Sequence, residues 1–497
     1  MNLPFAEFDE VHVISDLHLG GRPGFQIFGS TAELAWLIDD LRQRPARRIA
    51  LVINGDFIDF LAQAPALPFD PEGAADKLAT IANESAFAPV FNALRAFTAT
   101  DNRQLIVNLG NHDLEFVLPW VREALLETLS GGNSAARGRI TLALDGTGVP
   151  MRVGGARVLC VHGNEVDLWN FADYERIRRI GRDFMQGRGA EPWVPNGGSQ
   201  LVSEVMNPLK QDYPFIDLLK PEMPAVFPML IALRPSVVTQ LGKLAAAVAR
   251  RSRDAVRMST GFLEEATPRT DVVAAAPAPR TVGSGGRRDL HRGSAMMARD
   301  LLDRAEASWR DEVVPLDLVS GDQRAEYLGL FGALKQLVTG KGQVEALREA
   351  LDGLDTDRSF DPGAEDDTYR ELDRLVGGDI DFLIAGHTHL ERALQRRRGR
   401  GFYFNSGTWA RLIQIPPQLR QDAAGFAEAF KRLKAGTMEA LDGGPMEPSL
   451  TQRRCSVVSI WQESGATIGE LRHVVAQPGA APAFAAKPVP GTRLPRT

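Results

Sequence analysis

Five short polar motifs, most of them placed where an apolar run ends, constrain this chain more than any other feature of its sequence. In order, they are Asp16-Leu-His18, Gly55-Asp56-Phe-Ile-Asp59, Gly110-Asn111-His112-Asp113, His162-Gly163 and Gly386-His387-Thr-His389. Five of the eight histidines lie in these motifs. Carboxylates, imidazoles and an amide are the ligands that a pair of divalent metal ions needs. The set is therefore typical of a site where two ions hydrolyse a phosphoester.

The apolar runs in front of the motifs predict β-strands. They cover residues 10–15, 48–54, 104–109, 157–161, 381–385 and 401–404. A helix with one apolar face is expected to begin at Thr31, and a helix-rich stretch covers about 76–98. Nearly apolar strands that alternate with helices predict a layered α/β domain. Because such sheets bind ligands at the carboxyl ends of their strands, we expect the five motifs to meet at one edge.

Composition and charge exclude several classes of protein. The 497 residues carry a formal net charge of −6, which gives no overall attraction to nucleic acid or to an anionic membrane. Two cysteines rule out a disulfide framework, and Cys160 lies in an apolar run that predicts a buried, reduced thiol. No export signal and no run of about 18 apolar residues is visible. These features predict a cytoplasmic protein without a transmembrane segment.

The segment between His162 and His387 differs from the rest of the chain. We predict a core in two parts, 1–190 and 371–475, separated by a mostly helical insertion at 191–370. Ala, Pro, Gly, Ser and Arg dominate the stretch near 265–295, which predicts a mobile linker, and 476–497 predicts a disordered tail. Because the insertion leaves and rejoins the core beside motifs, we interpret it as a lid. Its helix 236–251 ends in a basic cluster, which leaves peripheral membrane contact open.

The ordered motifs resemble those of the calcineurin-like metallophosphoesterase superfamily. That pattern runs Asp-x-His, Gly-Asp-x-x-Asp, Gly-Asn-His-Asp/Glu, Gly-His or His-Gly, and Gly-His-x-His, and it covers roughly 1–170 and 375–410 here. The resemblance implies a four-layer α/β/β/α sandwich that is discontinuous in sequence. It also implies two divalent ions, with manganese expected first and iron, zinc or cobalt as alternatives, because Asp, Asn and His suit them all.

The resemblance also assigns a role to each motif residue. One ion would be held by Asp16, His18, Asp56 and His389. The other would be held by Asp56, Asn111, His162 and His387. His112 would face the leaving group and Asp59 would orient it, while a hydroxide bridging the two ions would attack the phosphorus in line.

Departures from subfamily patterns narrow the substrate. Protein Ser/Thr phosphatases have Arg-Gly after Gly-Asp-x-x-Asp, whereas this chain has Phe60-Leu61. Residues 15–20 resemble the start of the bacterial UDP-2,3-diacylglucosamine pyrophosphatases, although that branch is much shorter and usually has Arg in place of His112. We therefore predict a phosphodiesterase or pyrophosphatase that acts on a small or lipid-like phosphoester.

Two other readings of the same motifs stay open. Exonucleases of the superfamily share Gly-Asn-His-Asp, so nucleic acid is a possible but less favoured substrate. The overall acidity speaks against it, and we interpret the arginine run at 396–400 as a solvated hairpin turn. A catalytically inactive, partner-binding scaffold is the second alternative, although no expected ligand is missing. Arg22 and Trp409 are candidates for substrate contact, and Trp409 equally for core packing.

Overall fold

The computed structural model describes a little under two thirds of the chain. It covers residues 5–45, 48–67, 69–167, 170–188, 213–219, 229, 233, 343–352, 358–413, 415, 417–442, 450–478 and 483–496. The predicted helix at 236–251 and the predicted linker near 265–295 lie outside these ranges. Within them, no helix is long and apolar enough to cross a membrane.

The larger sheet has eight strands and a parallel centre. In spatial order its strands are β15 (Ala483–Pro488), β14 (Ala466–Gln477), β13 (Ser456–Glu463), β2 (Glu10–Ile14), β3 (Ile49–Asn54), β4 (Arg103–Asn108) and β5 (Ile140–Ala143), and β16 (Leu494–Arg496) also pairs with β14. Strands β2, β3 and β4 confirm three of the predicted strands to within one residue at each end.

The smaller sheet has six strands and carries the remaining motifs. In spatial order they are β1 (Ala6–Phe8), β6 (Val149–Val153), β7 (Ala156–Cys160), β8 (Phe382–Ala385), β10 (Phe402–Ser406) and β9 (Glu391–Gln395). Strands β7, β8 and β10 run parallel to one another. They join segments of the chain that lie more than 200 residues apart, which confirms three further predicted strands.

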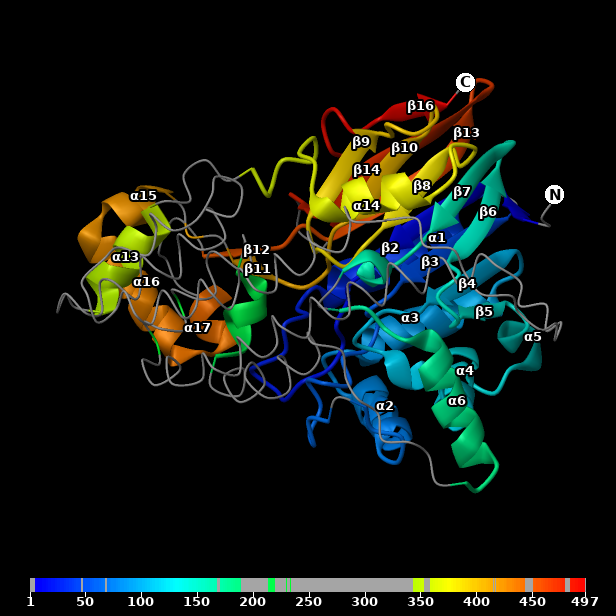
Figure 1. Ribbon diagram of the computed structural model, residues 1–497, viewed down its shortest axis with the longest axis horizontal. Coiled ribbons are helices and arrows are strands. Elements are labelled where there is room, and N and C mark those ends of the chain that lie inside the picture. The colour runs from blue at the N-terminus through cyan, green and yellow to red at the C-terminus, as the bar shows by residue number, and fades with distance from the viewer. Residues whose placement is uncertain are drawn as a thin grey trace, which may run out of the picture.

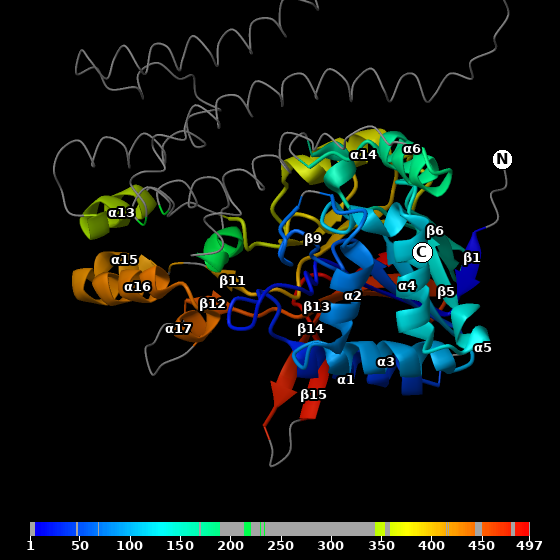
Figure 2. The same cartoon turned by 90° about the horizontal axis from the view of Figure 1, so that it is seen from below.

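Helices cover the outer faces of the two sheets, as Figures 1 and 2 show. The larger sheet is covered by α1 (Thr31–Gln43), α2 (Ala74–Asn83), α3 (Ala88–Ala99) and α4 (Pro119–Ser130). The smaller sheet is covered by α14 (Asp367–Leu375). Along β3, Leu51 and Ile53 pack toward the helices, whereas Ala50 and Val52 pack between the sheets. Alternation with period two therefore builds the predicted α/β/β/α sandwich.

A separate cluster of helices lies beside the sandwich (Figure 1). It comprises η4 (Pro214–Leu218), α13 (Gln343–Asp352), α15 (Pro417–Gln421), α16 (Ala423–Ala435) and α17 (Met438–Asp442), with a ribbon of β11 (Leu412–Ile413) and β12 (Thr451–Gln452). We call this set the helical unit. Helices α15 to α17 fall within the predicted 371–475 part of the core, yet they pack with η4 and α13 in a core of their own. The sandwich is therefore interrupted a second time.

The predicted disordered tail at 476–497 is wrong for most of its length. Strands β15 and β16 both pair with β14 in antiparallel register. Phe484 and Ala486 also pack against the core beneath α1 and α3, and Leu494 packs between the sheets. The composition of this segment is poor in large apolar residues, but pairing along a neighbouring strand satisfies its backbone without them.

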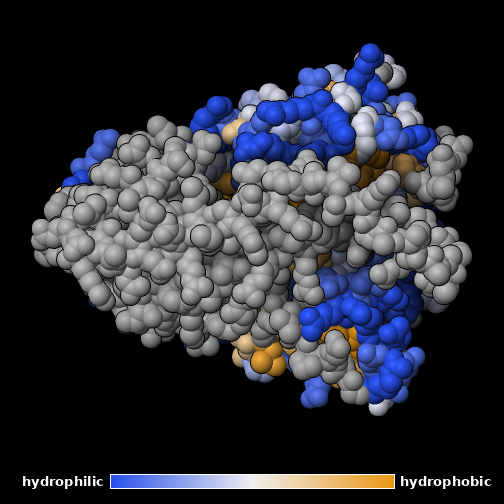
Figure 3. All heavy atoms as spheres, in the orientation of Figure 1, coloured by the Kyte–Doolittle hydropathy of each residue, from blue (hydrophilic) through white to orange (hydrophobic). Residues whose placement is uncertain are grey.

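The arginine run of the β9–β10 turn is only partly solvated. Arg396 is 2% exposed, and its guanidinium pairs with Asp373 and donates to the carbonyl oxygens of Val376, Gly377 and Ile380. It therefore caps the end of α14, so the solvated interpretation is wrong for this residue. Where Figure 3 shows described residues, the surface is mostly hydrophilic. Among all described residues, the large exposed hydrophobic side chains are Leu67, Phe184 and Met185.

Candidate metal centre

Each motif begins at the carboxyl end of a strand. Asp16 and His18 follow β2, Asp56 follows β3, Asn111 and His112 follow β4, His162 follows β7, and His387 and His389 follow β8. The carboxyl ends of the two sheets meet here, since Asn54 at the end of β3 donates to the carbonyl oxygen of Val161 just beyond β7. The predicted convergence of motifs that are far apart in sequence is confirmed.

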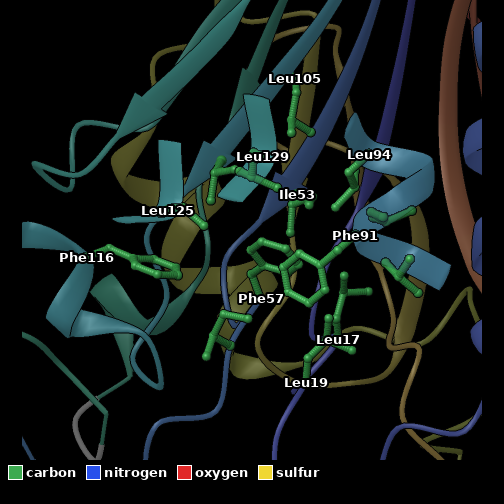
Figure 4. Packing of buried hydrophobic residues seen from close by; sticks show 14 of the residues in the cluster. Leu17, Leu19, Ile53, Phe57, Phe91, Leu94, Leu105, Phe116, Leu125 and Leu129 are labelled. Carbon is green, nitrogen blue, oxygen red and sulfur yellow. The ribbon is translucent and has the colours of Figure 1, made fainter. Parts of the chain in front are cut away.

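Apolar residues between the polar ones anchor the motif loops. Leu17, Leu19 and Phe57 are fully buried beneath the site, packed among the side chains shown in Figure 4. The polar residues next to them adopt the left-handed backbone conformation, with φ of 54° at Asp16 and 52° at Asp56. His18, His387 and His389 share this conformation. Such strain costs free energy and collects at functional sites, so packing must hold these loops in place.

Three motif glycines are required by the side chains of other motifs. A Cβ atom at Gly55 would lie 2.2 Å from Nδ1 of His162, and one at Gly110 would lie 2.1 Å from Oδ1 of Asp56. A Cβ atom at Gly386 would lie 2.5 Å from Oγ of Ser15. The glycines thus allow the loops from both sheets to approach closely.

Asp16, His18 and His389 form a first group of candidate ligands, with one donor atom each within 4.8 Å of the others. The Nε2 atoms of the two histidines face each other at 3.0 Å. Asp16 lies 3.4 Å from Nε2 of His389 and accepts from the backbone N–H of His387 at 3.0 Å. We refer to these three residues as the first group.

Asp56, His162 and His387 form a second group that meets the same criterion. Nε2 of His162 lies 3.3 Å from Oδ2 of Asp56, while its Nδ1–H donates to the carbonyl oxygen of Asn54 at 2.8 Å. That bond occupies Nδ1 and directs Nε2 into the site. Nε2–H of His387 donates to Asp167 at 2.7 Å.

Asp56 lies between the two groups. Its Oδ2 atom is 3.3 Å from Nε2 of His162 and 3.7 Å from Nε2 of His18, so one oxygen reaches both sets. Its Oδ1 atom accepts from the backbone N–H of His112 at 2.9 Å. This is the placement that a bridging carboxylate requires.

Asp59 lies between His112 and His18. Its carboxylate is 3.2 Å from Nδ1 of His112 and 3.4 Å from Nδ1 of His18. The two imidazoles meet edge to face, with their centroids 4.8 Å apart. The side chain of His112 is 15% exposed, the most accessible of the three. Asp59 can therefore orient both rings at once.

The site contains buried carboxylates whose pKa values are lowered by the imidazoles around them. Burial would raise the pKa of Asp56, but the surrounding imidazoles, with His162 first, hold it well below the usual range. Burial would likewise lower the pKa of His162, yet the Asp56 carboxylate more than offsets this and raises it to about 10. Carboxylates that remain ionised in a buried cluster favour bound positive charge.

Sequence reasoning missed two residues that contact candidate ligands and gave no role to a third. Asn54 accepts from His162 and carried no signal beyond ending a strand. Asp113 was part of a motif without an assigned role, and it accepts from the backbone N–H groups of Gly110 and Phe57. Burial, together with the charge of Asp56, raises the pKa of Asp113 to about 7. Asp167 gave no signal at all, because it lies five residues after its motif.

The two candidates for substrate contact have structural partners. Trp409 is 1% exposed, packs in the core under the motif loops and donates to the carbonyl oxygen of Ser456. It is therefore a packing residue. The guanidinium of Arg22 lies over the ring of Phe25, 3.7 Å from the centroid. Cys160 and Cys455 are buried and free, as predicted for Cys160.

The donor atoms of the site fit divalent metal ions. Oδ1 of Asn111, Nε2 of His162 and Nδ1 of His18 are buried, and none makes a well-formed hydrogen bond within the described residues. Buried polar atoms left in this state are costly unless something binds them. Oxygen and imidazole donors around each group suit manganese, iron, cobalt or zinc. The predicted ligands are thus assembled, and their individual roles stay predictions.

Comparison with known proteins agrees with this arrangement. Residues 10–216, a little over two fifths of the chain, match the model of the calcineurin-like phosphoesterase family. No curated protein matches the sequence. The matched range ends before His387 and His389, so only the fold shows that these two residues join the same site.

Proposed function

We propose that this chain, whose residues 10–216 match the calcineurin-like phosphoesterase family, hydrolyses a phosphodiester or a pyrophosphate with two divalent ions. Members of this family are in general phosphoester hydrolases. The observation that carries the proposal is the position of Asp56, whose Oδ2 atom reaches both groups of candidate ligands. This position is consistent with the two predicted ligand sets, in which Asn111 joins Asp56, His162 and His387 around the second ion.

The ions would supply an activated water and would neutralise charge on the phosphoryl oxygens. The protein would position the reacting groups and would donate one proton to the leaving group. Asp59 lies 3.2 Å from Nδ1 of His112, and Nε2 of that ring would donate the proton to the oxygen of the leaving group. Because the backbone N–H of His112 is bound to Asp56, the proton donor and the bridging carboxylate are fixed relative to each other.

The residues after Asp59 support a diester or pyrophosphate over a phosphoprotein. Phe60 and Leu61 are buried in the position where protein phosphatases carry Arg-Gly. Neither side chain can pair with the additional charge of a phosphomonoester. A small or lipid-like substrate therefore fits this centre best, and manganese is the first metal to test.

The nuclease alternative loses support from the fold. Arg396 is buried against Asp373, and Arg397 pairs with Glu365, so part of the basic run is neutralised by the protein itself. We keep cleavage of DNA as an outcome to be measured at two salt concentrations, because electrostatic binding of DNA weakens steeply with salt.

The test is Mn²⁺-dependent hydrolysis of bis(p-nitrophenyl) phosphate against p-nitrophenyl phosphate by the full chain. We expect the diester to be cleaved faster, and Asp56→Asn to abolish the activity. Asp379→Asn, an exposed aspartate that pairs with Arg157 before the start of β8, is the matched control and should behave as the parent. Metal-loaded protein that cleaves neither ester would favour the scaffold alternative.

A further inference from the structure

Asp167 contacts a candidate ligand from outside the five motifs. Its Oδ2 atom accepts from Nε2–H of His387 at 2.7 Å, across 220 residues of sequence. The side chain of Asp167 is 25% exposed, whereas that of His387 is 8% exposed. Asp167 therefore approaches the ring from the rim of the site, whereas His162 and Asp56 lie deeper, with side chains 0% and 2% exposed.

The loop that carries Asp167 is held by its own hydrogen bonds. Asp167 ends the short helix η2 (Asn164–Val166), where its backbone N–H donates to the carbonyl oxygen of Asn164. Asn170 donates from Nδ2 to the same Oδ2 atom at 2.7 Å. Asn164 donates to the carbonyl oxygen of Asn170, and the hydroxyl of Tyr174 donates to Asn164. These hydrogen bonds hold the Asp167 carboxylate in place independently of its contact with His387.

A carboxylate that holds one nitrogen of an imidazole decides which nitrogen is left for a metal ion. In this site Nε2 of His387 is engaged, so Nδ1 is the nitrogen available to the second group. The ring of His162 packs edge to face against His387, with the centroids 5.3 Å apart, and restricts the other side. Contacts on two sides leave the ring little freedom to turn.

We propose that Asp167 is a positioning residue that holds His387 through Nε2 and directs Nδ1 toward the ion of the second group. This inference rests on the proposed two-ion function. It assigns Asp167 no contact with substrate. Its effect should therefore be confined to one of the two ions.

The experiment is a titration of the metal-free full chain with Mn²⁺, followed by electron paramagnetic resonance of the free ion. In Asp167→Ala we expect one of the two ions to bind about 10- to 100-fold more weakly, with the other unchanged. In Asp167→Asn we expect a much smaller loss, because the amide oxygen can still accept from Nε2–H. This rescue separates orientation by a hydrogen bond from supply of a charged ligand.

A matched control is available in the same loop. Asp173 caps helix α6 (Tyr174–Met185) by accepting from the backbone N–H of Arg176. Asp173→Asn should bind both ions as the parent does, which would show that replacing an aspartate in this loop does not by itself weaken metal binding. Wild-type affinity for both ions in Asp167→Ala would overturn the proposal, and so would an equal loss in Asp167→Asn and Asp167→Ala. A parent chain that binds no Mn²⁺ would instead overturn the proposed function.

Discussion

The two groups of candidate ligands differ in what orients their histidines. In the second group, His162 and His387 each donate from one ring nitrogen to an oxygen outside the group, on Asn54 and Asp167. In the first group, His18 and His389 turn their Nε2 atoms toward each other at 3.0 Å. Nδ1 of His18 is 3.4 Å from Asp59, a carboxylate that also faces His112.

The two groups of one site are therefore pre-organised for metal binding to different degrees. An imidazole that is already oriented loses less freedom when it binds an ion. Two imidazole nitrogens facing each other must be drawn apart or bridged before an ion is held. We therefore expect the second group to bind the first equivalent of metal.

Asp56→Asn should have the largest effect and should affect both groups alike, because Asp56 reaches both. We expect both ions to be weakened and diester hydrolysis to fall by a factor of about a thousand or more. Metal content after dialysis and the turnover rate both report the effect. Loss of only one ion in this variant would mean that Asp56 belongs to a single group.

His112→Ala should separate catalysis from metal binding. His112 contacts Asp59 through its side chain and Asp56 through its backbone N–H, which alanine retains. We expect kcat to fall about a hundredfold or more while both ions are retained. The loss should shrink for substrates whose leaving group needs no proton. Release of an ion from this variant would instead identify His112 as a ligand.

A pair of variants tests the order in which the groups fill. Titration of the parent with Mn²⁺ should show two affinities that differ about tenfold or more. His162→Ala should remove the tighter class, and His18→Ala the weaker one. The opposite assignment would show that orientation by Asn54 and Asp167 does not set the affinity.

The smallest effect concerns Glu115, a buried carboxylate outside both groups. It is 2% exposed in η1 (Leu114–Val117), and burial raises its pKa to about 8. The unfolded chain releases this proton near pH 4.5, whereas the folded protein keeps it to about pH 8. The contribution of Glu115 to the free energy of unfolding is therefore greatest below pH 4.5, and it is lost as the pH rises toward 8.

Glu115→Gln removes this dependence and keeps an oxygen to accept from the backbone N–H of Asp70. Relative to the parent, the variant should gain at least about 1 kcal/mol of stability between pH 5 and pH 7. Urea unfolding in the presence of a chelator measures it without interference from bound metal. A stability difference that stays constant with pH would contradict the raised pKa.

Several features were predictable because they are local. An apolar run that stops at a polar motif marks a strand end, and β2, β3, β4, β7, β8 and β10 all lie within about two residues of their predicted bounds. Others depended on distant partners. From the sequence alone, Arg396 is predicted to be a solvated turn residue, but in the fold it binds the end of α14. Residues 483–496 are predicted to be disordered, but in the fold they include two strands that pair with β14.

The strand positions and the candidate donor atoms could be predicted from the sequence, because strand periodicity and ligand chemistry are properties of a few adjacent residues. The tertiary structure grouped the candidate ligands. Asp16 and His387 are 371 residues apart, and their contact exists because β2 and β8 end at the same edge. It also decided that Asp167 reaches His387 and that α15 to α17 join the helical unit, since each needs a partner that no local pattern can specify.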